Sequence, residues 1–421
     1  MDSLSWGAII VKVLARFLPV WIALVVTFAL SIRYKRSLGL YGKLFDSPVG
    51  MTGFAVVMFW VFTAIFANLI ATYDPILQLG SVKNPLPGTP VPDPADGAYQ
   101  WFLLGGDHLA RDVFSRMVMG ARQVLIIAPA ATTFAYIVGI TLGLPAGYYG
   151  GKIDTILSFL SNLVLAFPVI LLFYLLVTPE ILRTGPAFGI YVNDALFEWR
   201  ASIPNVMAAL LFVFPIIFMY ILITSRYYTD PPRQKRYLTI TMILGIWVYS
   251  GLAFHADPSG LIMSFFAGLF GYGPVQAIWG MDPNLLNVFV SVVFVNAPTV
   301  FRIVRGITLD LKARDYVAAG QTRGEGPWYL MLWEILPNAR GPLIVDFCLR
   351  IGYTTILLGT LGFFGLGVSP DSPDWGSTIN AGRKLLSLFP HPAVVPALSL
   401  MSLVLGLNLL ADGLREESLK D

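Results

Sequence analysis

The sequence predicts an all-α membrane protein, a polytopic bundle of about 8–10 transmembrane helices. The first observation is composition: of 421 residues, 56% are hydrophobic and only 13% are charged, whereas a soluble domain is about one quarter charged. The second is a series of roughly nine apolar stretches near the length that a membrane-spanning helix needs. The third is that lysine and arginine gather in a few short loops. The net charge of +3 gives no indication of nucleic-acid binding.

The apolar stretches follow one another along the whole chain. In order they are 8–31, 51–73, 122–147, 153–177, 202–224, 237–255, 285–305, 343–366 and 391–411. The first contains Lys12 and Arg16 but no small-x-small cleavage site, so we interpret it as a retained anchor helix. A further stretch, 261–279, is interrupted by glycines and a proline and is a candidate re-entrant or interfacial helix.

The basic loops predict the orientation. Loops 32–43, 225–236 and 302–323 carry most of the lysines and arginines, and such loops face the cytoplasm. Even numbers of predicted spans separate them, which is consistent with one side. The N-terminus then lies outside and the C-terminus inside. The loop 74–121 would lie outside, and its proline-rich tract 84–97 excludes helix. The other loops predicted outside are 178–201, 256–284 and 367–390.

The sequence lacks an energy source of its own. The nearest approach to a phosphate-binding loop is YYGGKID, but Ala146 and Ile153 occupy positions that need Gly and Ser or Thr. Ionisable residues, which a proton- or sodium-coupled carrier buries at mid-membrane, occur only near the predicted span ends. The three histidines are scattered, and Cys348 is a single cysteine. We therefore expect no catalytic residue, metal or cofactor, and a translocation subunit driven by a partner.

The polar loop 312–340 carries the most functional information. Asp315 is placed to cap a helix, and Gly324 is placed to stop it. A second helical stretch follows, and Leu336 and Pro337 end it. A short helix of small residues that projects from a membrane protein can lie in a groove of a partner. We interpret this segment as a docking element and name residues 312–340 the coupling loop.

The spacing in this loop resembles the EAA loop of binding-protein-dependent ABC importers, whose pattern is E-A-A-x3-G-x9-I-x-L-P. The pattern aligns with Ala318, Ala319, Gly320, Gly324, Glu334, Leu336 and Pro337, and four of these residues, Ala319, Gly324, Leu336 and Pro337, match it. Three residues depart from the pattern. Ala318 stands where the family has Glu, Gly320 where it has the last Ala, and Glu334 where it has Ile.

Three further segments resemble the C-type permease subunit of oligopeptide, dipeptide and nickel importers. They are GGDHLARDVFSRMVMGAR at 105–122, LGFFGLGVSPDSPDWGSTINAGR at 361–383 and LNLLADGLRE at 407–416. In the first, Gly106 and Ala110 replace the family's Thr and Gly. The resemblance implies a type I ABC-importer permease core in a prokaryotic inner membrane.

The same resemblance implies a division of the chain. Residues 1–45 would be an extra N-terminal helix with a basic loop, and 46–177 the first half of the core. Residues 178–284 would be an insert, and 285–421 the second half with the coupling loop. The insert could shape the exit side, contact a binding protein or fill lipid-facing space.

The resemblance also implies partners. They are a homologous permease subunit, two cytoplasmic ATPase subunits that bind ATP and magnesium, an external solute-binding protein and membrane lipid. Tyr316, Ala319, Gly320 and Gly324 are the candidate ATPase contacts. In the alternative reading, Tyr316 packs on the bundle and Gly324 only stops a helix.

Two groups of residues are candidates near the predicted external side. Asp107, Arg111, Asp112, Arg116 and Arg122 precede a span. The spacing of Asp112 and Arg116 suits an ion pair on a helix, so we favour a structural or gating role over peptide contact. Asp371, Asp374 and Trp375 form the second group. They are candidates for contact with the binding protein, or part of a plain loop.

The leading interpretation is an importer permease for peptides. Nickel chelates and oligosaccharides stay open as substrates, and an autonomous channel or secondary carrier is the alternative class. Gly139, Gly143 and Gly147 recur every four residues, which predicts a face for close helix packing.

Overall fold

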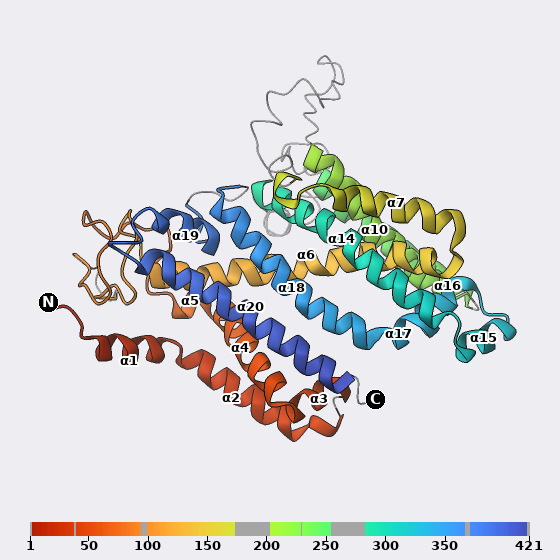
Figure 1. Ribbon diagram of the computed structural model, residues 1–421, viewed down its shortest axis with the longest axis horizontal. Helices are drawn as coiled ribbons and strands as arrows, with labels where there is room; N and C mark the ends of the chain where they lie inside the picture. The colour runs from red at the N-terminus through yellow and green to blue at the C-terminus, as the bar shows by residue number, and fades with distance from the viewer. Residues whose placement is uncertain are drawn as a thin grey trace, which may run out of the picture. The chain divides into compact units, whose positions relative to one another are not determined.

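The computed structural model describes residues 2–37, 39–92, 94, 99–172, 203–228, 230–253, 283–366 and 371–418. Helices make up most of this part of the chain, as the sequence predicts (Figure 1). The longer helices are α1 (Trp6–Arg16), α2 (Leu18–Arg33), α4 (Pro48–Ile65), α6 (Val113–Tyr149), α7 (Gly151–Ala166), α10 (Ile203–Arg226), α11 (Pro231–Ala253), α14 (Pro283–Leu311), α18 (Arg340–Phe363) and α20 (His391–Ser418). Shorter ones are η1 (Lys35–Ser37), α3 (Gly39–Lys43), η2 (Leu44–Asp46), α5 (Ala67–Ile70), α15 (Asp315–Thr322), α16 (Pro327–Tyr329), η3 (Leu330–Ile335), α17 (Leu336–Asn338) and α19 (Trp375–Arg383).

Five of these helices are long and apolar enough to cross a membrane: α4, α6, α14, α18 and α20. The pair α1 and α2 passes the same test together but bends by 55°. The anchor predicted as one helix over 8–31 is therefore two helices joined at Phe17. The span predicted over 51–73 ends earlier, at Ile65. The stretch 261–279 lies outside the described residues.

The chain divides into two compact units, residues 1–130 with 341–421 and residues 131–340. In the first unit, α4 packs along α20. A small core of Leu44, Phe45, Phe54, Val345, Ala411 and Leu414 fills the space beside this pair. The Trp60 side chain joins the two helices, because its indole N–H donates to Ser402 Oγ at 2.9 Å. This unit thus has its own hydrophobic core.

Glycines allow α4 and α20 to approach at backbone distance. A Cβ added at Gly53 would overlap the backbone of Leu409 and Leu410. Substituting Gly53 by alanine should destabilise the protein by about 1–3 kcal/mol, because the backbone of α20 cannot rotate away as a side chain can. Gly306→Ala is the matched control, because that helix glycine has no atom within 4 Å of the added Cβ. Thermal unfolding in detergent should show a lower midpoint for Gly53→Ala alone; equal midpoints would contradict this packing.

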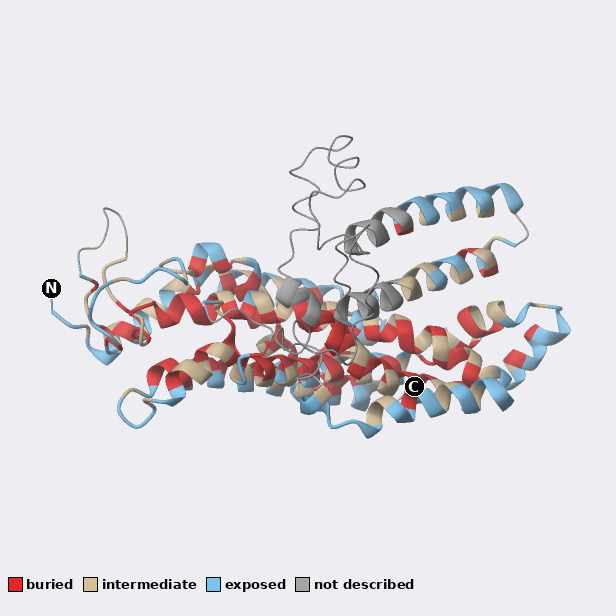
Figure 2. Cartoon of the chain, turned by 90° about the horizontal axis from the view of Figure 1, so that it is seen from above, coloured by how far each residue is buried: buried red, intermediate tan, exposed pale blue. Residues whose placement is uncertain are grey.

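In the second unit, α14 packs against α7 and against the glycine face of α6. Cβ atoms added at Gly139 and Gly143 would lie 2.5 Å and 2.9 Å from Val300 and Val304 side-chain atoms. The small-residue face predicted from the spacing is therefore used for close helix contact. Figure 2 shows runs of buried residues along several of the helices.

The segment between α5 and α6 contains the proline-rich tract. Its described residues form no helix, only turns and isolated bridges such as Pro90 with Trp101. Lys12 of α1 lies over the Trp101 ring, 4.4 Å from its centre, and Arg16 lies 4.9 Å from the centre of the Tyr99 ring. The two charges in the apolar N-terminal stretch are thus accommodated by aromatic faces.

Candidate functional site

The first half of the coupling loop is the helix α15, Asp315–Thr322. The expectation that Asp315 caps this helix was wrong. The N-cap is Arg314, with no side-chain cap bond, and Asp315 is the first helical residue. An acidic residue there still interacts favourably with the positive end of the helix dipole. The helix boundary itself agrees with the prediction.

The residues of α15 fall on two faces. Ala318 and Ala319 are exposed, whereas Val317 and Gly320 are buried. A Cβ added at Gly320 would come within 2.5 Å of Leu330 Cδ2. This explains why glycine replaces the family's alanine. The exposed face of α15 offers small side chains, which allow a partner to approach closely.

Gly324 ends the helix as predicted. Its φ is +81° and a Cβ there would meet nothing within 4 Å, so only the backbone conformation requires glycine. The chain then continues through α16 into η3, a π-helix over Leu330–Ile335. We expected Leu336 and Pro337 to end the helical stretch. Instead, they begin α17. Pro337 lies in the first two positions of this three-residue helix.

The two halves of the loop are joined by an ion pair. Arg323 Nη2 donates to Glu334 Oε1 at 2.8 Å, and Glu334 is the residue that stands where the family has isoleucine. Ala318, where the family has glutamate, is exposed and carries no charge. The chain therefore has its carboxylate on the second half of the loop, in contact with the end of α15.

The loop is also attached to α6. Lys312 Nζ donates to the carbonyl oxygens of Gly147 and Tyr148, at 2.9 Å and 3.3 Å. Gln321 donates to the Tyr148 hydroxyl at 3.3 Å. Tyr316 is half-buried, its hydroxyl has no hydrogen-bond partner among the described residues, and burial raises its pKa. This packing favours a structural role for Tyr316 over contact with a partner.

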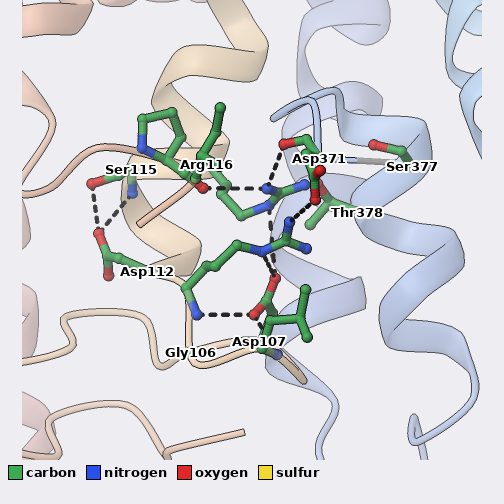
Figure 3. Close-up of polar contacts among 12 residues, drawn as sticks. Gly106, Asp107, Asp112, Ser115, Arg116, Asp371, Ser377 and Thr378 are labelled. Atoms are coloured by element: carbon green, nitrogen blue, oxygen red, sulfur yellow. Dashed lines mark hydrogen bonds and ion pairs between the residues drawn. The ribbon is translucent and has the colours of Figure 1, made fainter. Parts of the chain in front are cut away.

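The segment before α6 forms a buried polar cluster (Figure 3). Asp107 accepts from the Arg111 side chain at 2.7 Å and from the backbone N–H groups of Leu109 and Arg111. Both charged side chains are about 2% exposed. The i,i+4 ion pair of this segment is therefore Asp107–Arg111. Because buried charges need partners, each of the two charges compensates the other within the turn that leads into α6.

The expected ion pair between Asp112 and Arg116 is not formed. Asp112 instead caps α6: its Oδ2 accepts from the N–H and the hydroxyl of Ser115, at 2.9 Å and 2.6 Å, and from Thr72 at 2.6 Å. Burial raises the pKa of Asp112. Arg116 turns the other way, toward the segment that precedes α19.

Arg116 donates to carbonyl oxygens of three residues, Pro75, Asp371 and Ser372, at 3.3, 3.3 and 2.7 Å. It also donates to Thr378 Oγ1 at 3.1 Å. Its side chain is about 1% exposed, and the nearest carboxylate, Asp107, is 3.9 Å away. Arg122, by contrast, lies on an exposed face and donates to Asn68 at 3.1 Å. Arg116 is thus the residue that joins three separate segments of the first unit.

Asp374 and Trp375 do not present their side chains to a partner. Asp374 caps α19 through the Ser377 N–H at 2.8 Å, and burial raises its pKa to about 6. Trp375 is fully buried and donates to the Met117 carbonyl at 2.9 Å. The Asp371 side chain is 67% exposed, and its Oδ1 accepts from Arg111 Nη1 at 3.4 Å.

The two departures in segment 105–122 differ in their physical consequences. A Cβ at Gly106 would come within 2.6 Å of Pro85 Cγ, which leaves no room for the family's threonine. Ala110 has φ +57° where the family has glycine, a conformation that costs a non-glycine residue about 1–2 kcal/mol. The loop keeps its path although the residue that favours it is absent.

Sequence reasoning missed four polar residues of these regions: Thr72, Ser115, Thr378 and His391. The buried His391 Nε2 lies 3.0 Å from the Gly106 carbonyl oxygen. Ser115 lies inside the recognised D-x-x-S-R pattern, which could have indicated it as the partner of Asp112. The others carry no signal in the sequence, because their contacts come from segments far apart in the chain.

Long apolar helices, a projecting helical loop and a buried polar cluster define a multi-pass membrane protein of the translocation class. Residues 237–416 match the family of binding-protein-dependent transport system inner membrane components. Over these residues the chain is similar to permease components of ABC importers, and permeases of this type work with ATPase and solute-binding partners. The match begins inside the segment interpreted as an insert, 178–284.

Named permeases are similar over most of the chain. The dipeptide transport system permease protein DppC of Alkalihalophilus pseudofirmus is 26% identical, over 89% of this chain and 87% of that protein. The di/tripeptide transport system permease protein DppC of Pseudomonas aeruginosa is 26% identical, over 86% and 85%. The glutathione transport system permease protein GsiD of Pectobacterium atrosepticum is 28% identical, over 74% and 70%.

Proposed function

We propose that this chain is the C-type permease subunit of an ATP-driven importer of di- or oligopeptides. The relatives named above are transport permeases for dipeptides, tripeptides or glutathione, all of which are short peptides. The proposed orientation places the coupling loop and the C-terminus in the cytoplasm. The basic loops 225–236 and 302–323 support this orientation.

The observation that carries the proposal is the construction of the coupling loop. Its exposed face has the small residues Ala318 and Ala319, and its other face is fixed to the end of α6 and to Leu330. A force on the exposed face is therefore transmitted to a spanning helix. The proposed mechanism is that ATP and magnesium bind to two partner subunits, whose closure moves α15. The bundle then alternates between two packings.

The remaining partners follow from the same proposal. A homologous permease subunit would complete the pathway, and an external solute-binding protein would deliver the peptide. Asp371 is the candidate contact for that protein, because its carboxylate is exposed. Hydrolysis of ATP would lie wholly in the partner subunits, so this chain would bind no cofactor itself.

Reconstitution tests this function directly. We expect the chain, produced with its partner permease and ATPases, to purify as one complex and to drive uptake of a labelled dipeptide into proteoliposomes. Uptake should require the binding protein and ATP, and a non-hydrolysable ATP analogue should abolish it. A chain that never purifies with an ATPase, or uptake without ATP, would contradict the importer and favour the channel or carrier class. Uptake of a nickel chelate or an oligosaccharide in place of the peptide would change the substrate only.

A further inference from the structure

The helices α10 and α11 belong to the segment interpreted as an insert, and they contact the coupling loop. Within the second unit, α11 packs on α10, and α10 packs on α14 and on α16 of the loop. Figure 2 shows the described part of this hairpin as mainly exposed or intermediate. The outer side of α11 exposes Ile240, Ile243 and Leu244. A hairpin that only filled lipid-facing space would need no specific contact with the loop, but it has one.

The contact is centred on Trp333. Its indole N–H donates to Ser225 Oγ at 3.2 Å, and the Ser225 hydroxyl donates in turn to the Leu222 carbonyl at 3.0 Å. The Arg226 guanidinium lies 4.8 Å from the centre of the Trp333 ring. Both partners of Trp333 are at the last turn of α10. A buried serine and a flat cation therefore fix the ring in position and orientation.

Trp333 lies in the part of the loop that most needs external support. It belongs to the π-helix Leu330–Ile335, a conformation rarer than the α-helix and often retained at functional positions. The next residue, Glu334, makes the ion pair with Arg323 at the end of α15. A continuous set of contacts thus runs from α10 through Trp333 and Glu334 to the helix proposed to meet the ATPase.

We propose that the α10–α11 hairpin is a brace for the coupling loop and that Trp333 is the positioning residue through which it acts. The brace holds the π-helix at a fixed position against α10, so that movement of α15 is passed to the spanning helices and not lost in the loop. The mechanical part of this inference follows from the contacts alone, and its consequence for transport rests on the proposed importer function.

Hydrogen exchange on the assembled complex tests the brace without reference to transport. Trp333→Phe keeps an aromatic ring, although a smaller one, and removes the N–H donor, so backbone amides of residues 327–338 should exchange about two- to tenfold faster. Ser225→Ala should act in the same direction, and Ser225→Thr, which keeps the acceptor oxygen, should restore slow exchange. Arg233→Gln is the matched control on the same hairpin, because Arg233 pairs with Asp230 at 3.1 Å and not with the loop.

The brace is overturned if Trp333→Phe leaves the exchange at 327–338 unchanged, or if Arg233→Gln accelerates it equally. The ATPase activity then tests the consequence. Trp333→Phe should lower the ratio of substrate-stimulated to basal activity several-fold. If the parent complex itself shows no stimulation or uptake, the proposed function fails, and the exchange data still decide whether the brace exists.

Discussion

Replacing Arg116 by methionine is expected to lower the free energy of unfolding by about 3–5 kcal/mol, the usual effect of removing one partner from a buried charged network. The substitution would leave the carbonyl oxygens of Pro75, Asp371 and Ser372 without their donor in a site closed to water. It would also leave the Asp107 carboxylate without its second cation. Methionine has a similar length, so little of the effect would come from an empty cavity.

The matched control is Arg122→Met on the same helix. Arg122 makes one hydrogen bond, to Asn68, on an exposed face, and such a bond contributes within about 0.5 kcal/mol. The loss of unfolding free energy for Arg116→Lys should fall between the losses for Arg116→Met and Arg122→Met. The reason is that a single ammonium cannot reach all the acceptors that the guanidinium fork reaches. Thermal unfolding of the three detergent-solubilised variants measures the order. An Arg116→Met midpoint equal to that of Arg122→Met would show that the cluster does not hold the unit together.

Replacing Gly324 by valine should abolish stimulation of the partner ATPase by substrate, while membrane insertion and folding stay normal. Folding is spared because the residue is exposed and no atom lies within 4 Å of an added Cβ. Coupling is lost because a β-branched residue at φ +81° is strained by about 1–2 kcal/mol. That strain is relieved only if α15 changes its direction relative to η3.

Gly324→Asn provides the control, since asparagine tolerates a positive φ far better than valine does. It should retain most of the stimulation. ATPase assays with and without substrate-loaded binding protein measure the effect, and peptide uptake gives an independent reading. If Gly324→Val transports peptide at the parent rate, the coupling role of this turn is wrong. If valine and asparagine fail equally, the effect comes from side-chain bulk at the partner surface and not from backbone strain.

The membrane-spanning helices could be predicted from the sequence, because a lipid environment requires helical structure. A long apolar stretch in a bilayer satisfies its backbone only as a helix, and helices accordingly occupy the stretches that the structure describes. The bend at Phe17 could not be read from hydropathy. Its signal is Pro19, which has no N–H and favours the first turn of a new helix, but proline is common enough in spans that it is weak evidence alone.

The coupling loop was predicted more accurately than the polar cluster, for a physical reason. The boundaries of α15 are local, and Gly324 determines its end through one backbone angle. Three of the four hydrogen-bond acceptors of Arg116 lie in 371–378 and the fourth is Pro75, and no spacing within 105–122 can indicate them. The expected Asp112–Arg116 pair also assumed that both residues point outward from one helix. Asp112 precedes the first helical residue, so its side chain turns back to cap the Ser115 N–H.

The close contacts at Gly139 and at Gly53 differ in which substitutions can compensate for a larger residue. The Cβ of an alanine at position 139 would lie 2.5 Å from Val300 Cγ1 and 2.7 Å from Val300 Cβ, so only glycine at position 300 would remove both contacts. The Cβ of an alanine at position 53 would meet the backbone of Leu409 and Leu410, which no exchange of side chains can remove. One paired exchange, alanine at position 139 with glycine at position 300, could therefore keep the contact between α6 and α14, whereas the contact between α4 and α20 requires glycine at position 53 itself.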